Sequence, residues 1–191
     1  LAQRDKVQAV GEIGLDFFYD YSDREVQRYW FRQQIRLANE LKMPIVIHAR
    51  EADQEVMDIL KEEGAFSSER KDCFPLRPDG SGDARVLLHC FSGSRELAEQ
   101  YVKLGATISI AGPVTYKNNK KTRAVAEAIP LEHLLVETDS PYLTPEPFRG
   151  KRNIPPYVEY TAGKIAEIKG MTLEAVAKQT LMNAKRFFGI Q

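Results

Sequence analysis

The sequence predicts an α/β protein built from parallel strands. Short apolar segments of strand length alternate with segments in which apolar residues recur at helical spacing, which is typical of βα units. One strand segment, Ile45-Val46-Ile47, is uniformly apolar, as expected for a strand covered on both faces. The 191 residues can bury a substantial core, so we expect one domain over residues 1–191. A complete (β/α)8 barrel needs about 250 residues. The predicted strands fit either a doubly wound sheet or part of a barrel.

The first predicted strand covers residues 7–13, and a long helix follows over about residues 23–42. Ser22 and Glu25 form the expected capping box at the start of this helix, and Pro44 stops it. Its core-facing stripe is expected to consist of four apolar residues: Val26, Trp30, Leu37 and Leu41.

The remaining elements follow the same alternation. Further strands are expected at residues 45–47, 85–89, 106–111 and 134–137, and helices at 52–63, 94–104 and 122–129. Gly64 and Gly105 close two of these helices as C-terminal caps. Residues 65–84 are polar and rich in Gly and Pro, so we expect a surface loop. The Pro-rich stretch 141–156 is a second loop, and two amphipathic helices end the chain near Phe188.

Composition excludes several classes of protein. The 27 basic and 27 acidic residues cancel, which argues against a surface coated in positive charge for non-specific DNA binding. The two cysteines, Cys73 and Cys90, form no close-spaced metal or redox pair, so a reducing, cytoplasmic setting is the default expectation. No apolar run approaches the roughly 18 residues of a membrane span, so no membrane partner is expected.

Four potential metal ligands come at or just past the ends of predicted strands: Glu12, His48, His89 and Asp139. The gaps between them are 36, 41 and 50 residues, each compatible with one or two βα units. Active sites of parallel α/β folds are built at the carboxyl ends of the strands, because the βα loops converge there. Two imidazoles and two carboxylates suit Zn, Mn, Ni or Mg, so the pattern favours a hydrolytic metal site.

Each of these residues also has a structural interpretation. A lone histidine after a strand is more often a hydrogen-bonded structural residue than a metal ligand. Glu12 can instead pair with Arg50. Asp139 can serve as a turn or N-cap carboxylate. Their joint placement favours the metal site. His133 precedes its strand, so we expect it at the opposite edge, as surface structure.

The run Arg149-Gly150-Lys151-Arg152-Asn153 places three cations and an amide on a flexible loop after the Asp139 strand. These groups can hold phosphate oxygens, although a solvated basic loop is an equal alternative. Tyr19, Tyr116 and Tyr142 lie on predicted loops and can either stack on bases or pack within the loops.

Six segments, in this order, resemble motifs of the TatD deoxyribonuclease family. They are Gly-Glu-Ile-Gly-Leu-Asp at 11–16, Ile-His-Ala-Arg at 47–50, His-Cys-Phe-Ser-Gly at 89–93, Glu-Thr-Asp-Ser-Pro-Tyr-Leu at 137–143, Arg-Gly-Lys-Arg-Asn at 149–153 and Asn-Ala-Lys-Arg-Phe-Phe at 183–188. The resemblance implies a metal-dependent hydrolase of DNA phosphodiesters, related to the amidohydrolases. It also implies a TIM-type (β/α)8 barrel, of which this chain supplies about the last five βα units.

The resemblance also implies roles for individual residues. Glu12 would bridge two divalent ions (Mg, Mn or Zn), His48 and His89 would hold one of them, and Asp139 would hold the other. The position of Asp139 also permits it to accept a proton from the activated water. The substrate phosphates would contact three cations: Arg50, Lys151 and Arg152.

The chain departs from the family pattern in two places. No His-x-His pair is present, so we expect the first three strands and that pair to belong to a segment ahead of residue 1, and Ile154 stands where the family usually has Glu. Two alternatives stay open. One is an amidohydrolase-type enzyme acting on a small phosphoester, lactone or amide, and the other is a catalytically dead fragment.

Overall fold

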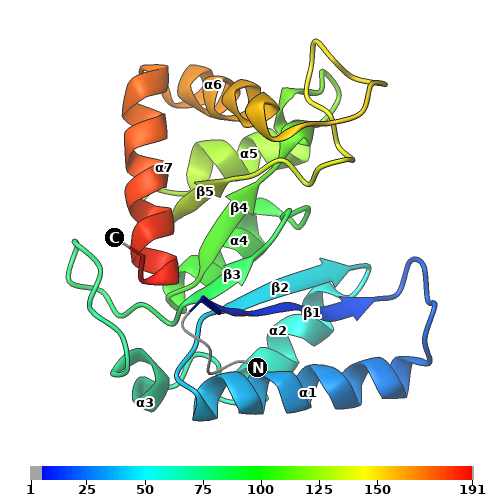
Figure 1. The fold of residues 1–191 in the computed structure, drawn as a ribbon, viewed down its shortest axis with the longest axis vertical. Coiled ribbons are helices and arrows are strands. Elements are labelled where there is room, and N and C mark those ends of the chain that lie inside the picture. The colour runs from blue at the N-terminus through cyan, green and yellow to red at the C-terminus, as the bar shows by residue number, and fades with distance from the viewer. Residues whose placement is uncertain (1–5, 191) are drawn as a thin grey trace. The chain divides into compact units, whose positions relative to one another are not determined.

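The computed structural model describes residues 6–190 (Figure 1). The chain folds into two compact units. The first unit comprises the residues up to His89 together with 103–106 and 187–189, and the second comprises the rest. The chain start at Leu1 lies outside the described residues. That the units form one catalytic barrel domain over residues 1–191 stays a prediction. No helix within residues 6–190 is long and apolar enough to cross a bilayer.

Three parallel strands in the order β1-β2-β3 form the sheet of the first unit: β1 (Val10–Asp16), β2 (Ile45–Arg50) and β3 (Val86–Leu88). Their inward side chains, such as Ile13 and Leu15 of β1, are buried. β1 begins and ends three residues later than the predicted strand at 7–13. Glu12 therefore lies within a strand and not at its end, which corrects the sequence-based placement. The alternation of side chains along β1 still puts Glu12 on the face opposite the core.

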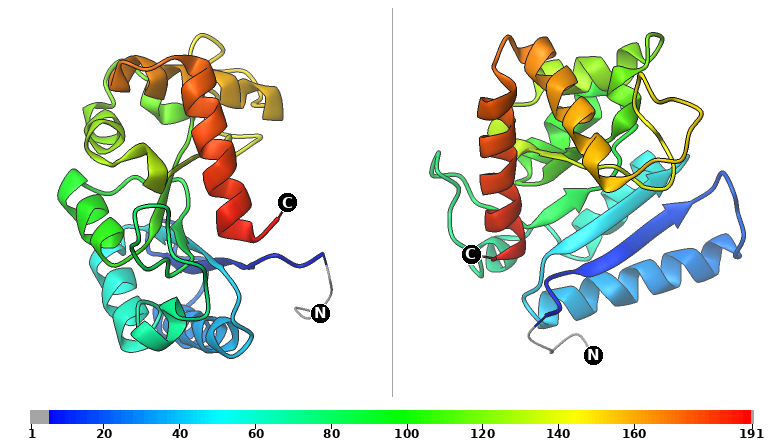
Figure 2. Two further views of the ribbon diagram at one scale, coloured as in Figure 1. Left: turned by 90° about the vertical axis from the view of Figure 1, so that its left-hand side faces the viewer. Right: turned by 45° about the horizontal axis from the view of Figure 1, so that its top comes forward.

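The long helix is confirmed as α1 (Arg24–Glu40), which lies alongside β1 (Figure 2). The predicted cap is wrong, because the carboxylate of Asp23, and not the hydroxyl of Ser22, accepts hydrogen bonds from the amides of Glu25 (2.8 Å) and Val26 (3.4 Å). Asp23 is a strong N-cap residue one position nearer to the first helical turn.

The predicted core-facing stripe of α1 is also wrong. Phe31, Ile35 and Ala38 are buried, whereas Val26, Trp30 and Leu37 are exposed, at 46%, 58% and 42%, and Leu41 follows the last helical residue as the C-cap. Both sets recur at helical spacing, roughly a third of a turn apart around the helix. Periodicity alone could not distinguish them, since packing against β1 decides which face is buried.

The segment 65–84 is more ordered than a plain surface loop. It follows α2 (Asp53–Glu62) and Gly64, whose positive φ of 71° closes that helix as predicted. It contains the short helix α3 (Ser68–Lys71) and several buried residues: Ala65, Phe66, Arg70, Arg77, Asp83 and Ala84.

Arg70 explains why this segment stays in place. Its guanidinium donates to the carbonyls of Ala84 (2.8 Å) and Met43 (2.8 Å) and to the side-chain oxygen of Asn39 (2.7 Å). Burial lowers the pKa of Arg70 to about 10, which leaves the group charged at neutral pH. Carbonyls of irregular backbone need donors when they are buried, and this cation supplies them.

In the second unit, β4 (Thr107–Ile110) pairs in parallel with β5 (Leu134–Val136). The expected helices are present, with α6 packed against η1 and α5. The α-helices are α4 (Arg95–Lys103), α5 (Lys120–Ala128), α6 (Val158–Lys169) and α7 (Leu173–Phe188). Three short 3-10 helices, η1 (Gly112–Thr115), η2 (Leu131–His133) and η3 (Pro155–Tyr157), lie between them. The predicted α/β class with parallel strands is therefore confirmed within each unit.

His133 precedes β5 as predicted, but it is only 7% exposed, so its assignment to the surface is wrong. Asn183 of α7 explains the burial of this turn. Its side-chain amide donates to the carbonyls of Leu131 (2.7 Å) and Leu134 (2.8 Å), which flank the histidine. The helix thus covers η2 and supplies the donors that its carbonyls need.

We expect Asn183→Ala to lower the free energy of unfolding by roughly 2–4 kcal/mol, because two buried carbonyls lose their donor at about 1–3 kcal/mol each. Urea denaturation measures this change. The control is Asn118→Ala, at an exposed asparagine of the same unit, for which we expect a change within about 0.5 kcal/mol. Equal stabilities of the two variants would contradict the structural role of Asn183.

Candidate metal centre

Three predicted ligands of the first unit converge. Glu12 comes from β1, His48 from β2, and His89 directly follows β3. The Nδ1 atom of His48 lies 2.8 Å, and the Nε2 atom of His89 3.3 Å, from the same carboxylate oxygen of Glu12. One ligand atom from each residue lies within 4.8 Å of the other two. The side chains of Glu12, His48 and His89 are 48%, 32% and 17% exposed, so the cluster can be reached from solvent.

Gly14 lets β1 approach β2 closely enough for this cluster to form. It pairs in register with His48, and a Cβ atom at Gly14 would lie 1.8 Å from the carbonyl oxygen of His48. Its φ of +150° is also one that side chains disfavour. Any larger residue would push the two strands apart at the position of His48.

Asp16 holds the other nitrogen of the same histidine. The Nε2 atom of His48 lies 3.1 Å from Oδ2 of Asp16, so carboxylates face both ring nitrogens. No role was predicted for Asp16 from the sequence. The signal was present, because Glu12, Gly14 and Asp16 alternate along one strand face, and His48 and Arg50 alternate beside them.

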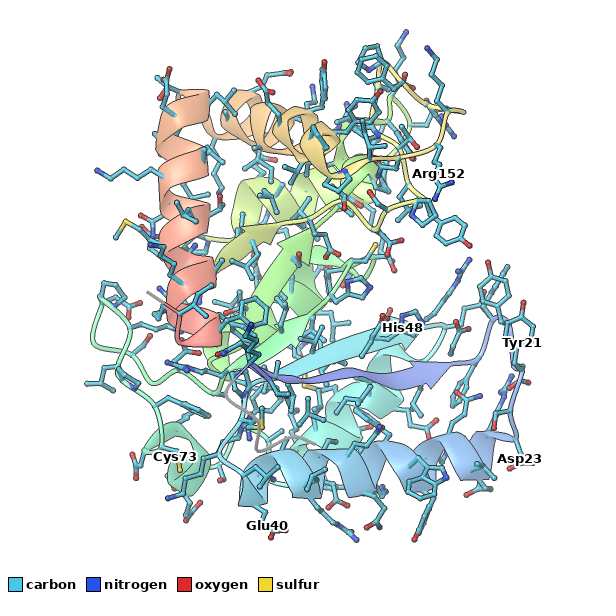
Figure 3. All side chains as sticks on the ribbon, viewed as in Figure 1. Tyr21, Asp23, Glu40, His48, Cys73 and Arg152 are labelled. Atoms are coloured by element: carbon cyan, nitrogen blue, oxygen red, sulfur yellow. The ribbon has the colours of Figure 1, made fainter. Side chains whose placement is uncertain are left out.

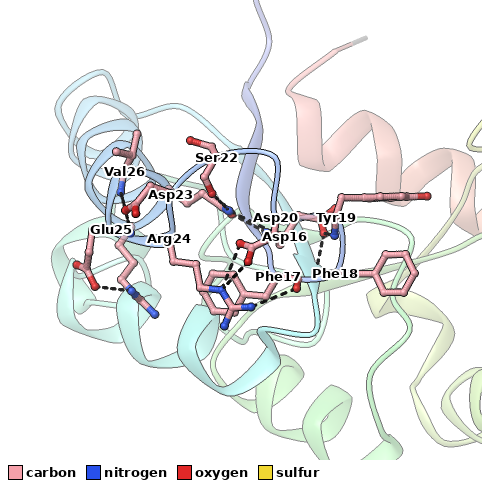
Figure 4. A network of polar contacts seen from close by, with 12 residues as sticks. Asp16, Phe17, Phe18, Tyr19, Asp20, Ser22, Asp23, Arg24, Glu25 and Val26 are labelled. Carbon is pink, nitrogen blue, oxygen red and sulfur yellow. Dashed lines mark hydrogen bonds and ion pairs between the residues drawn. The ribbon is translucent and has the colours of Figure 1, made fainter.

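Asp16 is itself fixed by a network of polar contacts (Figure 4). Its Oδ1 atom accepts hydrogen bonds from the amides of Phe18 (3.0 Å) and Tyr19 (2.9 Å). Its own amide donates to the side chain of Gln27 in α1 (2.9 Å). The strand end, the following loop and α1 thus orient one carboxylate toward His48.

The pKa shifts agree with a charged cluster. The hydrogen bond from His48 lowers the pKa of Glu12 against the opposing effect of burial, and the same bond raises the pKa of His48. Burial acts to raise the pKa of Asp16, but bonds from the Tyr19 amide, His48 and the Phe18 amide together hold it below its usual value. Both carboxylates are therefore ionised at neutral pH.

The three donors fit a divalent metal ion. Ligand atoms about 2 Å from a common ion lie roughly 2.8–3.5 Å from one another, and the observed separations of 2.8 and 3.3 Å match this. Imidazole and carboxylate suit Zn or Mn. A carboxylate on the second nitrogen, as Asp16 provides for His48, is the usual support of a metal-binding histidine.

Glu12 pairs with the two histidines and not with Arg50, so the structural alternative for Glu12 is wrong. The guanidinium carbon of Arg50 instead lies 4.1 Å from the ring centre of Phe18 and 4.6 Å from that of Tyr19.

Asp139, the fourth predicted ligand, belongs to the second unit and follows β5 in a turn. It is half-buried with a φ of +56°, and its carbonyl accepts from the amide of Tyr142 (2.9 Å). Its role as a ligand stays a prediction. Glu137, for which no role was predicted, accepts a hydrogen bond from the amide of Cys90 in the same unit (2.7 Å).

The basic loop of the second unit has a different arrangement from the predicted one. Lys151 and Arg152 are exposed, as phosphate-binding cations should be (Figure 3 labels Arg152). Asn153 is only 2% exposed and donates to the carbonyls of Thr138 (2.8 Å) and Tyr142 (2.7 Å). The amide therefore anchors the end of the loop and is not available to a phosphate.

The three tyrosines expected on loops also differ from one another. Tyr116 hydrogen-bonds the carbonyl of Thr144 (3.1 Å), and the Arg149 guanidinium lies 4.3 Å from its ring centre, so it packs within the second unit. Tyr19 and Tyr142 are 49% and 71% exposed.

Comparisons with known proteins agree with this geometry. A family model described as "TatD related DNase" matches residues 1–189. YabD of Bacillus subtilis (strain 168), named as a metal-dependent hydrolase, is 47% identical over 190 residues, covering 100% of this chain and 68% of YabD. The 3'-5' ssDNA/RNA exonuclease TatD of Erwinia amylovora is 33% identical over 195 residues, covering 100% of this chain and 69% of that protein.

The crystal structure of YJJV, a TatD homologue from Escherichia coli K12, is similar with a TM-score of 0.79 at 31% identity. The match covers 96% of this chain and 64% of YJJV, so the chain spans about two thirds of the length of these relatives. This likeness confirms the predicted TIM-type fold class, whereas the assignment to the last five βα units stays a prediction. Together with the family match over nearly all its residues, it shows that the chain belongs to the TatD related DNase family.

Proposed function

We propose that the protein is a metal-dependent hydrolase of nucleic-acid phosphodiester bonds, with DNA as its substrate. The observation that carries the proposal is the convergence of Glu12, His48 and His89 on one point with their ligand atoms within 4.8 Å. The names of relatives such as YabD and the Erwinia amylovora exonuclease support metal-dependent hydrolysis and a nucleic-acid substrate.

His48 and His89 would hold one divalent ion, and Glu12 would be shared with a second one. Divalent ions (Mg, Mn or Zn) at such sites lower the pKa of water and neutralise charge on phosphoryl oxygens. Glu12 can act as a metal ligand at neutral pH, because its lowered pKa keeps the carboxylate ionised. Asp16 holds the ring of His48 so that Nδ1 faces Glu12, the orientation in which this nitrogen would bind an ion.

We assign the remaining roles to Asp139 and to three cations. Asp139 would be a ligand of the second ion and would accept the proton of the attacking water. Arg50, Lys151 and Arg152 would bind the substrate phosphates. The side chains of Lys151 and Arg152 are exposed, so they can reach the phosphates of a DNA strand.

The function is tested with the complete gene product, including any segment that precedes residue 1. We expect His48→Ala and His89→Ala each to lower bound Zn or Mn, measured by elemental analysis, and to reduce DNA hydrolysis at least about 100-fold, since each removes a ligand. The matched control is His133→Gln, which changes the third histidine of the chain and should keep the metal. Hydrolysis of a panel of small phosphoesters, lactones and amides, with DNA left intact, would contradict the DNA assignment.

We expect Asp16→Asn to weaken Zn or Mn binding about 10- to 100-fold, because the amide group cannot accept hydrogen bonds from both His48 and the loop amides. Isothermal titration measures the affinity, and thermal denaturation of the metal-free protein should change far less. Asp20→Asn is the control, since Asp20 lies on the same loop and pairs with Arg24. Unchanged metal affinity in Asp16→Asn would show that Asp16 does not position the histidine.

We expect the double variant Lys151→Gln/Arg152→Gln to weaken DNA binding and to reduce the salt dependence of binding by about one unit of slope per lost phosphate contact, with metal content unchanged. Binding is measured by fluorescence anisotropy at several salt concentrations. The control is Lys120→Gln/Lys121→Gln, two exposed lysines at the start of α5. Loss of metal with DNA binding retained would assign the two cations a structural role.

A further inference from the structure

The connection between β1 and α1 exposes three aromatic side chains, which we call the aromatic surface: Phe18, Tyr19 and Tyr21. They are 52%, 49% and 89% exposed. Their rings contact one another, with Phe18 edge-on to Tyr19 (5.0 Å between centres) and Tyr19 stacked on Tyr21 (5.3 Å, 9° between planes). Figure 3 shows Tyr21 at the outer end of this connection. Exposed apolar side chains that form a contiguous patch often mark a binding site.

The aromatic surface is held in place. The Phe18 and Tyr19 amides bond to the carboxylate of Asp16, and Asp20 on the same turn pairs with Arg24 of α1 (3.2 Å). These contacts are part of the polar network drawn in Figure 4. A partner that lands on the rings therefore meets an ordered surface and does not have to order the loop, which saves entropy on binding.

The same carboxylate connects the aromatic surface to the metal centre. Asp16 accepts from the Phe18 and Tyr19 amides through one oxygen and faces Nε2 of His48 through the other (3.1 Å). The surface therefore begins one side chain away from a metal ligand. Arg50, two residues after His48, lies over the rings of Phe18 and Tyr19 and adds a positive charge at the same place.

We propose that the aromatic surface binds unpaired nucleobases of the substrate strand by stacking that continues outward from Tyr21, the most exposed of its rings. Arg50, which lies over the rings of Phe18 and Tyr19, supplies charge beside them. Flat aromatic rings next to a guanidinium match the faces of bases and a phosphate backbone, whichever base is present. Base faces within a duplex are covered by their neighbours, so only bases out of the stack can land on the rings. The inference rests on the proposed function, because a strand whose phosphate lies at the metal centre brings its neighbouring base to this surface.

The test compares two fluorescein-labelled strands of equal length and charge, an oligothymidylate and a strand of abasic sugar phosphates, by anisotropy in EDTA so that no cleavage occurs. We expect the complete protein to bind the base-containing strand about 10-fold or more tightly than the abasic one. The triple variant Phe18→Ala/Tyr19→Ala/Tyr21→Ala should lose this preference while its affinity for the abasic strand and for Mn stays within about twofold. Tyr19→Phe/Tyr21→Phe, which keeps the ring faces, should retain the preference.

The matched control is Tyr29→Ala/Trp30→Ala, which removes an exposed aromatic pair of α1 that also has its rings in contact (5.2 Å). This variant should bind both strands like the wild type. Equal binding of the two strands by the wild type, or an unchanged preference in the triple variant, would overturn the inference even if cleavage is normal. Loss of Mn binding in the triple variant would also overturn it, since the rings would then support the metal centre. If the proposed function is wrong, the result differs: the protein keeps its preference for the base-containing strand, but addition of Mn produces no cleavage.

Discussion

The arrangement of the candidate site depends on one imidazole held between two carboxylates. His48 contacts Glu12 through Nδ1 and Asp16 through Nε2, at 2.8 and 3.1 Å. This pairing requires β1 and β2 to approach closely, and Gly14 permits the approach because a side chain there would collide with the carbonyl of His48. A charged cluster is costly unless its members neutralise one another. Here the acid and base partners shift the pKa values of Glu12 and His48 in opposite directions, which favours the charged pair.

The sequence alone sufficed to find the three candidate ligands that the first unit brings together. Glu12 and His48 lie within neighbouring strands, and His89 directly follows the next strand. Parallel pairing brings such positions close together without any knowledge of side-chain packing. Asp16 could have been found from its alternation with Glu12 along β1. The turn glycine Gly64 was equally predictable, because the left-handed conformation it adopts is a local property.

Features that depend on contacts far along the chain could not be predicted in this way. α1 has apolar residues on two faces, and only packing against β1 selects Phe31 over Trp30 for burial. His133 is buried because Asn183, fifty residues later, covers its turn. Arg70 lies in a segment whose polar composition indicates a surface loop, yet its donors face carbonyls that are distant in sequence. Composition reports the average environment of a segment and not the environment of one side chain.

The basic run 149–153 combines both kinds of residue within five positions. Lys151 and Arg152 point outward and are available to a ligand, whereas the Asn153 side chain points inward to the carbonyls of Thr138 and Tyr142, on either side of Asp139. A short polar motif can therefore expose cations and anchor its own backbone at once, since consecutive residues of an irregular loop can face solvent or backbone independently. The same division occurs at the end of β1, where Asp16 faces His48 and the next residues of the chain present aromatic rings to solvent. In both places a polar side chain, buried in Asn153 and partly buried in Asp16, fixes the backbone from which the exposed groups project. The geometry of the exposed groups is therefore determined by a residue that no ligand needs to contact.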